Sequence, residues 1–125
     1  MVVGLGIDIV DLEEFRAGLN DSRVDRLYLP DEVGYARTQA RSWENLGARL
    51  AAKRAVFRAL GAEVGGEPDW HDVEVLRRES GELDVRLTGG ALALAGRLGA
   101  RECSLSMTHT RRTALAVAIL QDGSK

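Results

Sequence analysis

The sequence predicts an α+β domain in which an antiparallel sheet packs on one long helix. Three observations predict this class: an apolar, strand-like segment at Val2–Val10, a strong helical pattern from about Ser42 to Leu60, and two later pairs of strand-like segments. Strands joined by short turns pair antiparallel, and a long helix with an apolar face needs a sheet to cover it. With 125 residues, 45% of them hydrophobic, the chain fits a single domain spanning residues 1–125.

The first half of the chain is predicted to be a buried strand followed by helices. Aliphatic side chains dominate Val2–Val10, and Gly4 and Gly6 within it indicate close approach of another backbone. Helices are expected from the N-cap Asp11 to about Leu19, over Arg23–Leu27, from Pro30 onward, and from Ser42 to Leu60 with Gly61 as C-cap.

The second half is predicted to hold two hairpins around one helix. Gly65, Gly66 and Pro68 indicate a loop. The expected elements are strands at Asp72–Arg77 and Leu83–Leu87, a helix from the cap Thr88 to Leu98, and strands at Ser104–Thr108 and Ala114–Leu120.

Composition excludes several classes of protein. The 17 basic and 19 acidic residues give a net charge of -2, which argues against a nucleic-acid partner. Cys103 is the single cysteine, so no internal disulfide can form. We expect a cytoplasmic protein with no membrane segment, because no leader-like pattern follows Met1 and no apolar run reaches membrane-helix length.

Basic residues concentrate in the long helix and just before it. Between Arg37 and Arg58 a single acid, Glu44, accompanies six basic residues: Arg37, Arg41, Arg49, Lys53, Arg54 and Arg58. Such a patch suits phosphates or an acidic partner. The alternative is the ordinary solvated face of an amphipathic helix.

Three short segments carry residues suited to chemistry. Asp8 lies within an apolar strand, where a carboxylate is costly unless it is paired, binds a cation, or caps the next helix at the strand edge. Arg54 and Arg58 lie four residues apart and share a helical face. Ser106–Thr110 carries hydroxyls around His109, which could bind phosphate oxygens or could be hydrogen-bonded structurally.

These segments together resemble the AcpS-type phosphopantetheinyl transferases, the holo-acyl-carrier-protein synthases. Gly6–Val10 is similar to the Gly-Ile-Asp-Ile-Val/Thr strand of that family, and Arg49–Ala55 to its Arg-Trp/Phe-Ala-Ala-Lys-Glu-Ala helix motif. Further likeness lies in Arg58–Gly61, in Ser106–Thr110 and in Leu29–Glu32. The likeness covers nearly the whole chain.

The resemblance implies an AcpS-like fold and transfer of 4′-phosphopantetheine from coenzyme A to a serine of an acyl carrier protein, in fatty-acid or polyketide biosynthesis. It also implies a homotrimer with active sites at subunit interfaces and a magnesium ion held between strand and helix. The implied catalytic positions are Asp8, Lys53, Arg54 and Arg58, with Asp8 as metal ligand and Arg16 meeting the carrier protein. The implied coenzyme A positions are Arg49, Lys53, Gly65, Ser106, Thr108, His109 and Thr110.

Two positions on the long helix depart from the family pattern at residues tied to the mechanism. Arg54 stands where the family has its second metal-ligating residue, a glutamate, and Arg58 stands where it has a lysine. A guanidinium offers no lone pair to magnesium and does not act as a base. Three alternatives stay open: magnesium-dependent transfer, transfer in which Arg54 takes the charge role of the metal, and a catalytically silent or repurposed relative that binds coenzyme A or a carrier protein.

Overall fold

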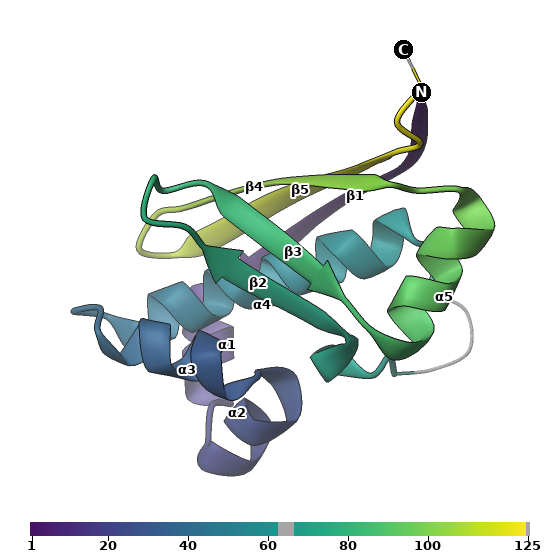
Figure 1. Ribbon diagram of the computed structural model, residues 1–125. Coiled ribbons are helices and arrows are strands. Elements are labelled where there is room, and N and C mark those ends of the chain that lie inside the picture. The colour runs from purple at the N-terminus through teal and green to yellow at the C-terminus, as the bar shows by residue number, and fades with distance from the viewer. Residues whose placement is uncertain (63–66, 125) are drawn as a thin grey trace.

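The structure is a computed structural model that describes residues 1–62 and 67–124, and it has the predicted α+β class (Figure 1). Its elements in order are β1 (Val2–Asp11), α1 (Leu12–Ala17), α2 (Asp21–Leu27), α3 (Pro30–Arg37), α4 (Ser42–Ala59), a 3-10 turn η1 (Trp70–Asp72), β2 (Val73–Arg77), β3 (Leu83–Leu87), α5 (Gly89–Leu98), β4 (Glu102–His109) and β5 (Thr113–Gln121).

Two antiparallel sheets form one side of the molecule. The larger has the strand order β1-β5-β4, and the smaller is the β2-β3 hairpin, which lies beside β4 (Figure 1). Asp8 of β1 lies opposite Ala116 of β5, which in turn lies opposite Met107 of β4. This register decides which side chains share a face of the sheet.

The long helix α4 covers the inner face of the sheet, and two glycines allow β1 to touch it. A Cβ atom on Gly6 would lie 2.8 Å from the amide nitrogen of Ala59 and closer still to the carbonyl oxygen of Ala55. A Cβ on Gly4 would meet the carbonyl of Ala59 in the same way. The predicted close backbone approach is therefore confirmed, and α4 is its partner.

The prediction that the first strand is wholly buried is wrong. Only alternate side chains of β1 face α4, whereas Leu5, Ile7 and Ile9 are 58%, 51% and 60% exposed. The reason is the two-residue period of a strand, which turns every second side chain to the outer face of the sheet. Because no helix of the described chain covers that face, it stays apolar and open.

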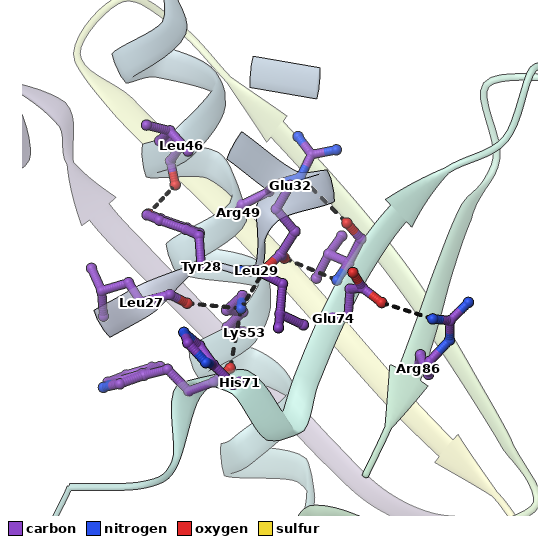
Figure 2. Close-up of polar contacts among 12 residues, drawn as sticks. Leu27, Tyr28, Leu29, Glu32, Leu46, Arg49, Lys53, His71, Glu74 and Arg86 are labelled. Atoms are coloured by element: carbon purple, nitrogen blue, oxygen red, sulfur yellow. Dashed lines mark hydrogen bonds and ion pairs between the residues drawn. The ribbon is translucent and has the colours of Figure 1, made fainter. Parts of the chain in front are cut away.

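A buried ionic network joins the helices to the small hairpin (Figure 2). The Glu32 carboxylate pairs with Lys53 Nζ at 2.7 Å and accepts hydrogen bonds from the amides of Leu29 at 2.9 Å and Val75 at 3.0 Å. Both ionised side chains are fully buried. Glu32 thus fixes the start of α3 against α4 and β2, and its pairing offsets the cost of burying charge.

The element bounds differ from the predicted ones by a few residues at helix ends. The helix after Asp11, α1, ends at Ala17, and Gly18 is its C-cap. The next helix, α2, begins at Asp21, because the Asn20 side chain accepts a hydrogen bond from the Arg23 amide in its first turn. Gly61 follows α4 with a φ of +75°, which suits a glycine past a helix end. No helix in the described part of the chain could cross a membrane.

Candidate functional site

Asp8 lies between two arginines of α4. Its Oδ2 is 3.1 Å from Arg54 Nε, and its Oδ1 is 3.3 Å from Arg58 Nη2. The Asp8 side chain is 4% exposed, whereas Arg54 and Arg58 are 40% and 44% exposed. The carboxylate is therefore buried in a doubly paired state, and the two guanidiniums extend from it towards solvent.

The backbone explains why these three side chains meet. Gly6 brings β1 against α4, and Asp8, two residues later, points to the same face of the strand. Arg54 and Arg58 lie one helical turn apart, so both reach that point from a single side of the helix. Gly4 and Gly6 thus let β1 approach α4 closely enough for Asp8 to contact both arginines.

A groove of about 430 Å³ opens beside this cluster. Arg54 lines it together with Ile9, Val10, Leu50, Phe15 and Arg23 and with the carboxylates Asp11 and Glu14. Its volume falls within the range of small-molecule sites. Arg54 therefore connects the buried Asp8 to a space that a ligand can enter.

The segment Ser106–Thr110 is divided between the two faces of the sheet. Ser106 and Thr108 lie in the same rows as Ile7 and Ile9, on the outer face, and so point away from the Asp8 carboxylate. His109 instead faces α4, with Nδ1 3.9 Å from a Glu44 carboxylate oxygen. Ser106 and Thr108 of the same chain therefore cannot reach the Asp8 carboxylate.

Thr110 shapes the turn between β4 and β5. Its hydroxyl oxygen accepts hydrogen bonds from the amides of Arg112 at 3.2 Å and Thr113 at 3.1 Å. Its predicted contact with coenzyme A stays a prediction, as does that of His109.

Arg49 and Lys53 have structural partners that account for their charges. Lys53 Nζ donates to the carbonyls of Leu27 at 2.8 Å and Trp70 at 3.1 Å besides pairing with Glu32, which uses all three ammonium donors (Figure 2). Burial lowers the pKa of Lys53, and the Glu32 charge opposes that shift. Its predicted catalytic role stays a prediction, and this geometry favours a structural one.

Arg49 is 1% exposed and lies in the same interior. Its guanidinium contacts the Asn45 side chain, donates to the Val75 carbonyl at 3.4 Å, and stacks over Tyr35 at 4.7 Å. The predicted basic patch is therefore not one surface, because α4 turns Arg49 and Lys53 inward and Arg54 and Arg58 towards Asp8.

Two other predicted positions are separate from the cluster. Arg16, on the exposed face of α1, stacks over the Trp43 ring at 4.0 Å. Gly65, predicted to bind coenzyme A, lies outside the described residues.

Comparison with known proteins assigns the chain to a family. A family model described as the 4′-phosphopantetheinyl transferase superfamily matches residues 4–118. The chain belongs to this superfamily. The synthase-type resemblance of the sequence motifs is therefore confirmed.

Relatives within the superfamily match the chain from end to end. A holo-(acyl-carrier-protein) synthase of Koribacter versatilis is 37% identical over 125 residues, which cover 98% of this chain and 100% of the relative. The crystal structure of the Neisseria meningitidis synthase matches with a TM-score of 0.83 and 25% identity over 97% of this chain and 99% of that one. A synthase–CoA complex from Chronobacterium ammoniagenes matches with a TM-score of 0.79 and 27% identity, over 94% and 96% of the two chains.

The residues around Asp8 do not fit the magnesium ion that this superfamily membership implies. Mg²⁺ prefers oxygen ligands, whereas Arg54 and Arg58, which contact Asp8, carry guanidiniums that offer no lone pair to a metal. An ion on the Asp8 carboxylate would lie within about 5 Å of both guanidiniums. At an effective dielectric constant of about 20, each would repel it by about 7 kcal/mol.

Sequence reasoning assigned no site role to three residues that the structure places near predicted site residues. Glu32 carries the buried network, and its place three residues after Leu29 at a helix start is the signal that indicates a cap. Arg23 lines the groove, and Glu44 lies beside His109. Neither position has a comparable sequence signal, because both contacts arise from tertiary packing alone.

Proposed function

We propose that this protein transfers 4′-phosphopantetheine from coenzyme A to a serine of an acyl carrier protein. Relatives that carry the synthase name match this chain over nearly its whole length. The single observation that carries the proposal is the cationic cluster of Arg54 and Arg58 on Asp8, placed beside an open groove. Such a protein would act in the cytoplasm, in fatty-acid or polyketide biosynthesis.

In the proposed reaction the serine hydroxyl oxygen attacks the pantetheine-bearing phosphorus of the coenzyme A pyrophosphate. A new oxygen–phosphorus bond forms, the bond to the bridging oxygen breaks, and adenosine 3′,5′-bisphosphate leaves with the electron pair. Arg54 and Arg58 offset the negative charge that develops on the leaving group. The serine proton passes to solvent water, since a guanidinium in a protein is already protonated and cannot accept it.

We also propose that the protein acts as a homotrimer. The outer face of the β1-β5-β4 sheet carries three exposed side chains, Leu5, Ile7 and Ile9, beside the partly exposed residues Leu115, Val117 and Ile119 of β5. A contiguous apolar patch of this kind is rare on a monomer and supports burial against another subunit.

The division of the predicted site residues between two faces supports sites at subunit interfaces. Ser106 and Thr108 lie on the outer face, whereas Asp8 faces α4. In a three-fold ring each interface joins two different surfaces, so the outer-face Ser106 and Thr108 of one chain would face the Asp8 groove of its neighbour. Symmetric oligomers build shared sites in this way.

The test of transfer is a mass measurement. Purified protein, coenzyme A and a panel of apo acyl carrier proteins should give a carrier heavier by one phosphopantetheine group, together with free adenosine 3′,5′-bisphosphate. Arg54→Ala should slow transfer. Arg97→Ala, which removes an arginine on α5, is the control and should leave transfer unchanged. If no carrier gains mass while coenzyme A still binds, the silent-relative alternative holds instead.

The test of assembly is the molar mass in solution. Light scattering should give three times the chain mass of 13.6 kDa, and Ile7→Lys should dissociate the trimer. Leu92→Lys is the matched control, because Leu92 is 55% exposed but lies on α5, away from the apolar sheet face. A monomeric parent protein would contradict the assembly.

The carrier protein would meet the edge of the site near α1. Arg16 is exposed there and offers a positive charge to an acidic carrier surface. Arg16→Glu should therefore raise the KM for the carrier while leaving the KM for coenzyme A unchanged. Equal carrier KM values for the two proteins would refute this contact.

A further inference from the structure

We infer that Arg54 and Arg58, held in place by Asp8, form a metal-independent clamp for the pyrophosphate of coenzyme A. This inference rests on the proposed function, since it names how that substrate is held. It differs from the magnesium arrangement that superfamily membership implies, because here the positive charge belongs to the protein itself.

The charge of the cluster favours an anion. Two guanidiniums contact the Asp8 carboxylate, and Arg54 supplies a positive charge where a glutamate would add a second negative one. A pair of carboxylates needs a divalent cation before it can accept a pyrophosphate. Arg54 and Arg58 attract the pyrophosphate directly.

The geometry leaves Arg54 able to grip a phosphate. Asp8 Oδ2 faces its Nε, and the described residues show no hydrogen bond to its two terminal nitrogens. These nitrogens belong to a planar fork whose spacing matches two phosphate oxygens. Because the side chain is 40% exposed and lines the groove of about 430 Å³, a ligand can reach them.

Asp8 acts in this arrangement as a positioning residue. Its two oxygens face different arginines, so one buried carboxylate orients both guanidiniums. Arg58, which is 44% exposed, contributes the second guanidinium on that carboxylate, one helical turn from Arg54. In the clamp each guanidinium would meet one phosphoryl group of the pyrophosphate.

Calorimetric titration with coenzyme A tests the clamp. Protein stripped of metal with EDTA should bind coenzyme A with the same affinity as protein in magnesium, and the affinity should fall steeply as salt rises. Coenzyme A binding that disappears with EDTA and returns with magnesium would overturn the inference. So would the absence of binding in both buffers.

Single substitutions test the two arginines separately. Arg54→Ala and Arg58→Ala should each weaken binding by about 10- to 100-fold, the range for a lost charged hydrogen bond. Each variant leaves Asp8 one arginine, so neither leaves a buried charge unpaired, and circular dichroism checks the fold. Arg97→Ala is the matched control and should bind as the parent protein does. Unchanged affinity in both test variants would refute the clamp.

Charge reversal gives an independent readout. Arg54→Glu places two carboxylates together, so coenzyme A binding should become magnesium-dependent in this variant alone. Binding by Arg54→Glu that ignores magnesium would contradict the proposed geometry.

The results separate this inference from the proposed function. Metal-independent coenzyme A binding without transfer to any carrier would retain the clamp and reject the function. Transfer that requires magnesium would retain the function and reject the clamp.

Discussion

The contact between Gly6 and α4 predicts that Gly6→Ala is among the most damaging single-methyl changes in this protein. The new Cβ would lie 2.8 Å from the Ala59 nitrogen and 2.9 Å from the Ala55 carbonyl carbon. Unstrained contacts of this kind need about 3.5 Å or more, and the Ala55 carbonyl oxygen is nearer still, so strand and helix must separate by more than about 1 Å.

The expected loss of stability depends on which atoms the new methyl group would meet, and here they belong to the backbone of α4. Overpacking typically costs about 1–3 kcal/mol, and the upper end applies because the obstacle is helix backbone rather than a flexible side chain. Alanine loses less conformational entropy on folding than glycine does, which offsets about 0.5–1 kcal/mol of this cost. The net loss in the free energy of unfolding is therefore about 2 kcal/mol.

Urea denaturation at one fixed protomer concentration measures this loss. Gly34→Ala is the matched control, since a Cβ there meets nothing within 4 Å and α3 should gain about 0.5–1 kcal/mol. Coenzyme A affinity should fall in Gly6→Ala as well, because separation of β1 from α4 pulls Asp8 away from its arginines. A Gly6→Ala protein as stable as the parent would refute the reasoning.

Four further predictions concern stability and reactivity. Lys53→Met leaves the Glu32 carboxylate buried without its ion pair and should cost about 3–5 kcal/mol in urea denaturation, whereas a loss below about 1 kcal/mol would show that the pair is dispensable. Burial raises the pKa of the Cys103 thiol from 9.0 to about 11, so a thiol reagent at pH 8 should label the native protein far more slowly than the urea-unfolded one. For the same reason the unfolded thiol ionises first, and stability should decline as pH rises from about 9 to 11; Cys103→Ser, which cannot ionise there, should weaken that decline. Asp11→Ala removes the carboxylate that caps α1 and should cost about 1 kcal/mol in thermal or urea unfolding, an effect that Asp11→Asn should largely avoid.

The element order could be predicted from sequence because each element has a local signal. Asp11 caps a helix, Pro30 begins one, and Gly61 follows the end of another. The exposure of β1 could not be predicted in the same way. A run of aliphatic residues looks the same whether its second face is covered by the chain's own helices or left for another molecule.

The site was predicted in part. Asp8, Arg54 and Arg58 stand out by residue type in an apolar strand and on one helical face, and the structure brings all three together. Arg49 and Lys53 share their helix and their charge, but side-chain burial on α4 depends on the positions of α2, α3 and β2, which periodicity does not give. Charge sequence alone therefore overstated the size of the basic surface.

The two glycines of β1 also determine how this strand can align with its neighbours. A slip of one residue would turn Leu5 and Ile7 towards the backbone of α4, where there is no room even for a methyl group. The same slip would carry the Asp8 carboxylate to the outer face and away from its arginines. Only Gly4 and Gly6 fit against the α4 backbone, so the misaligned sheet is sterically excluded. Two residues without side chains thus determine on which face of the sheet Asp8 lies.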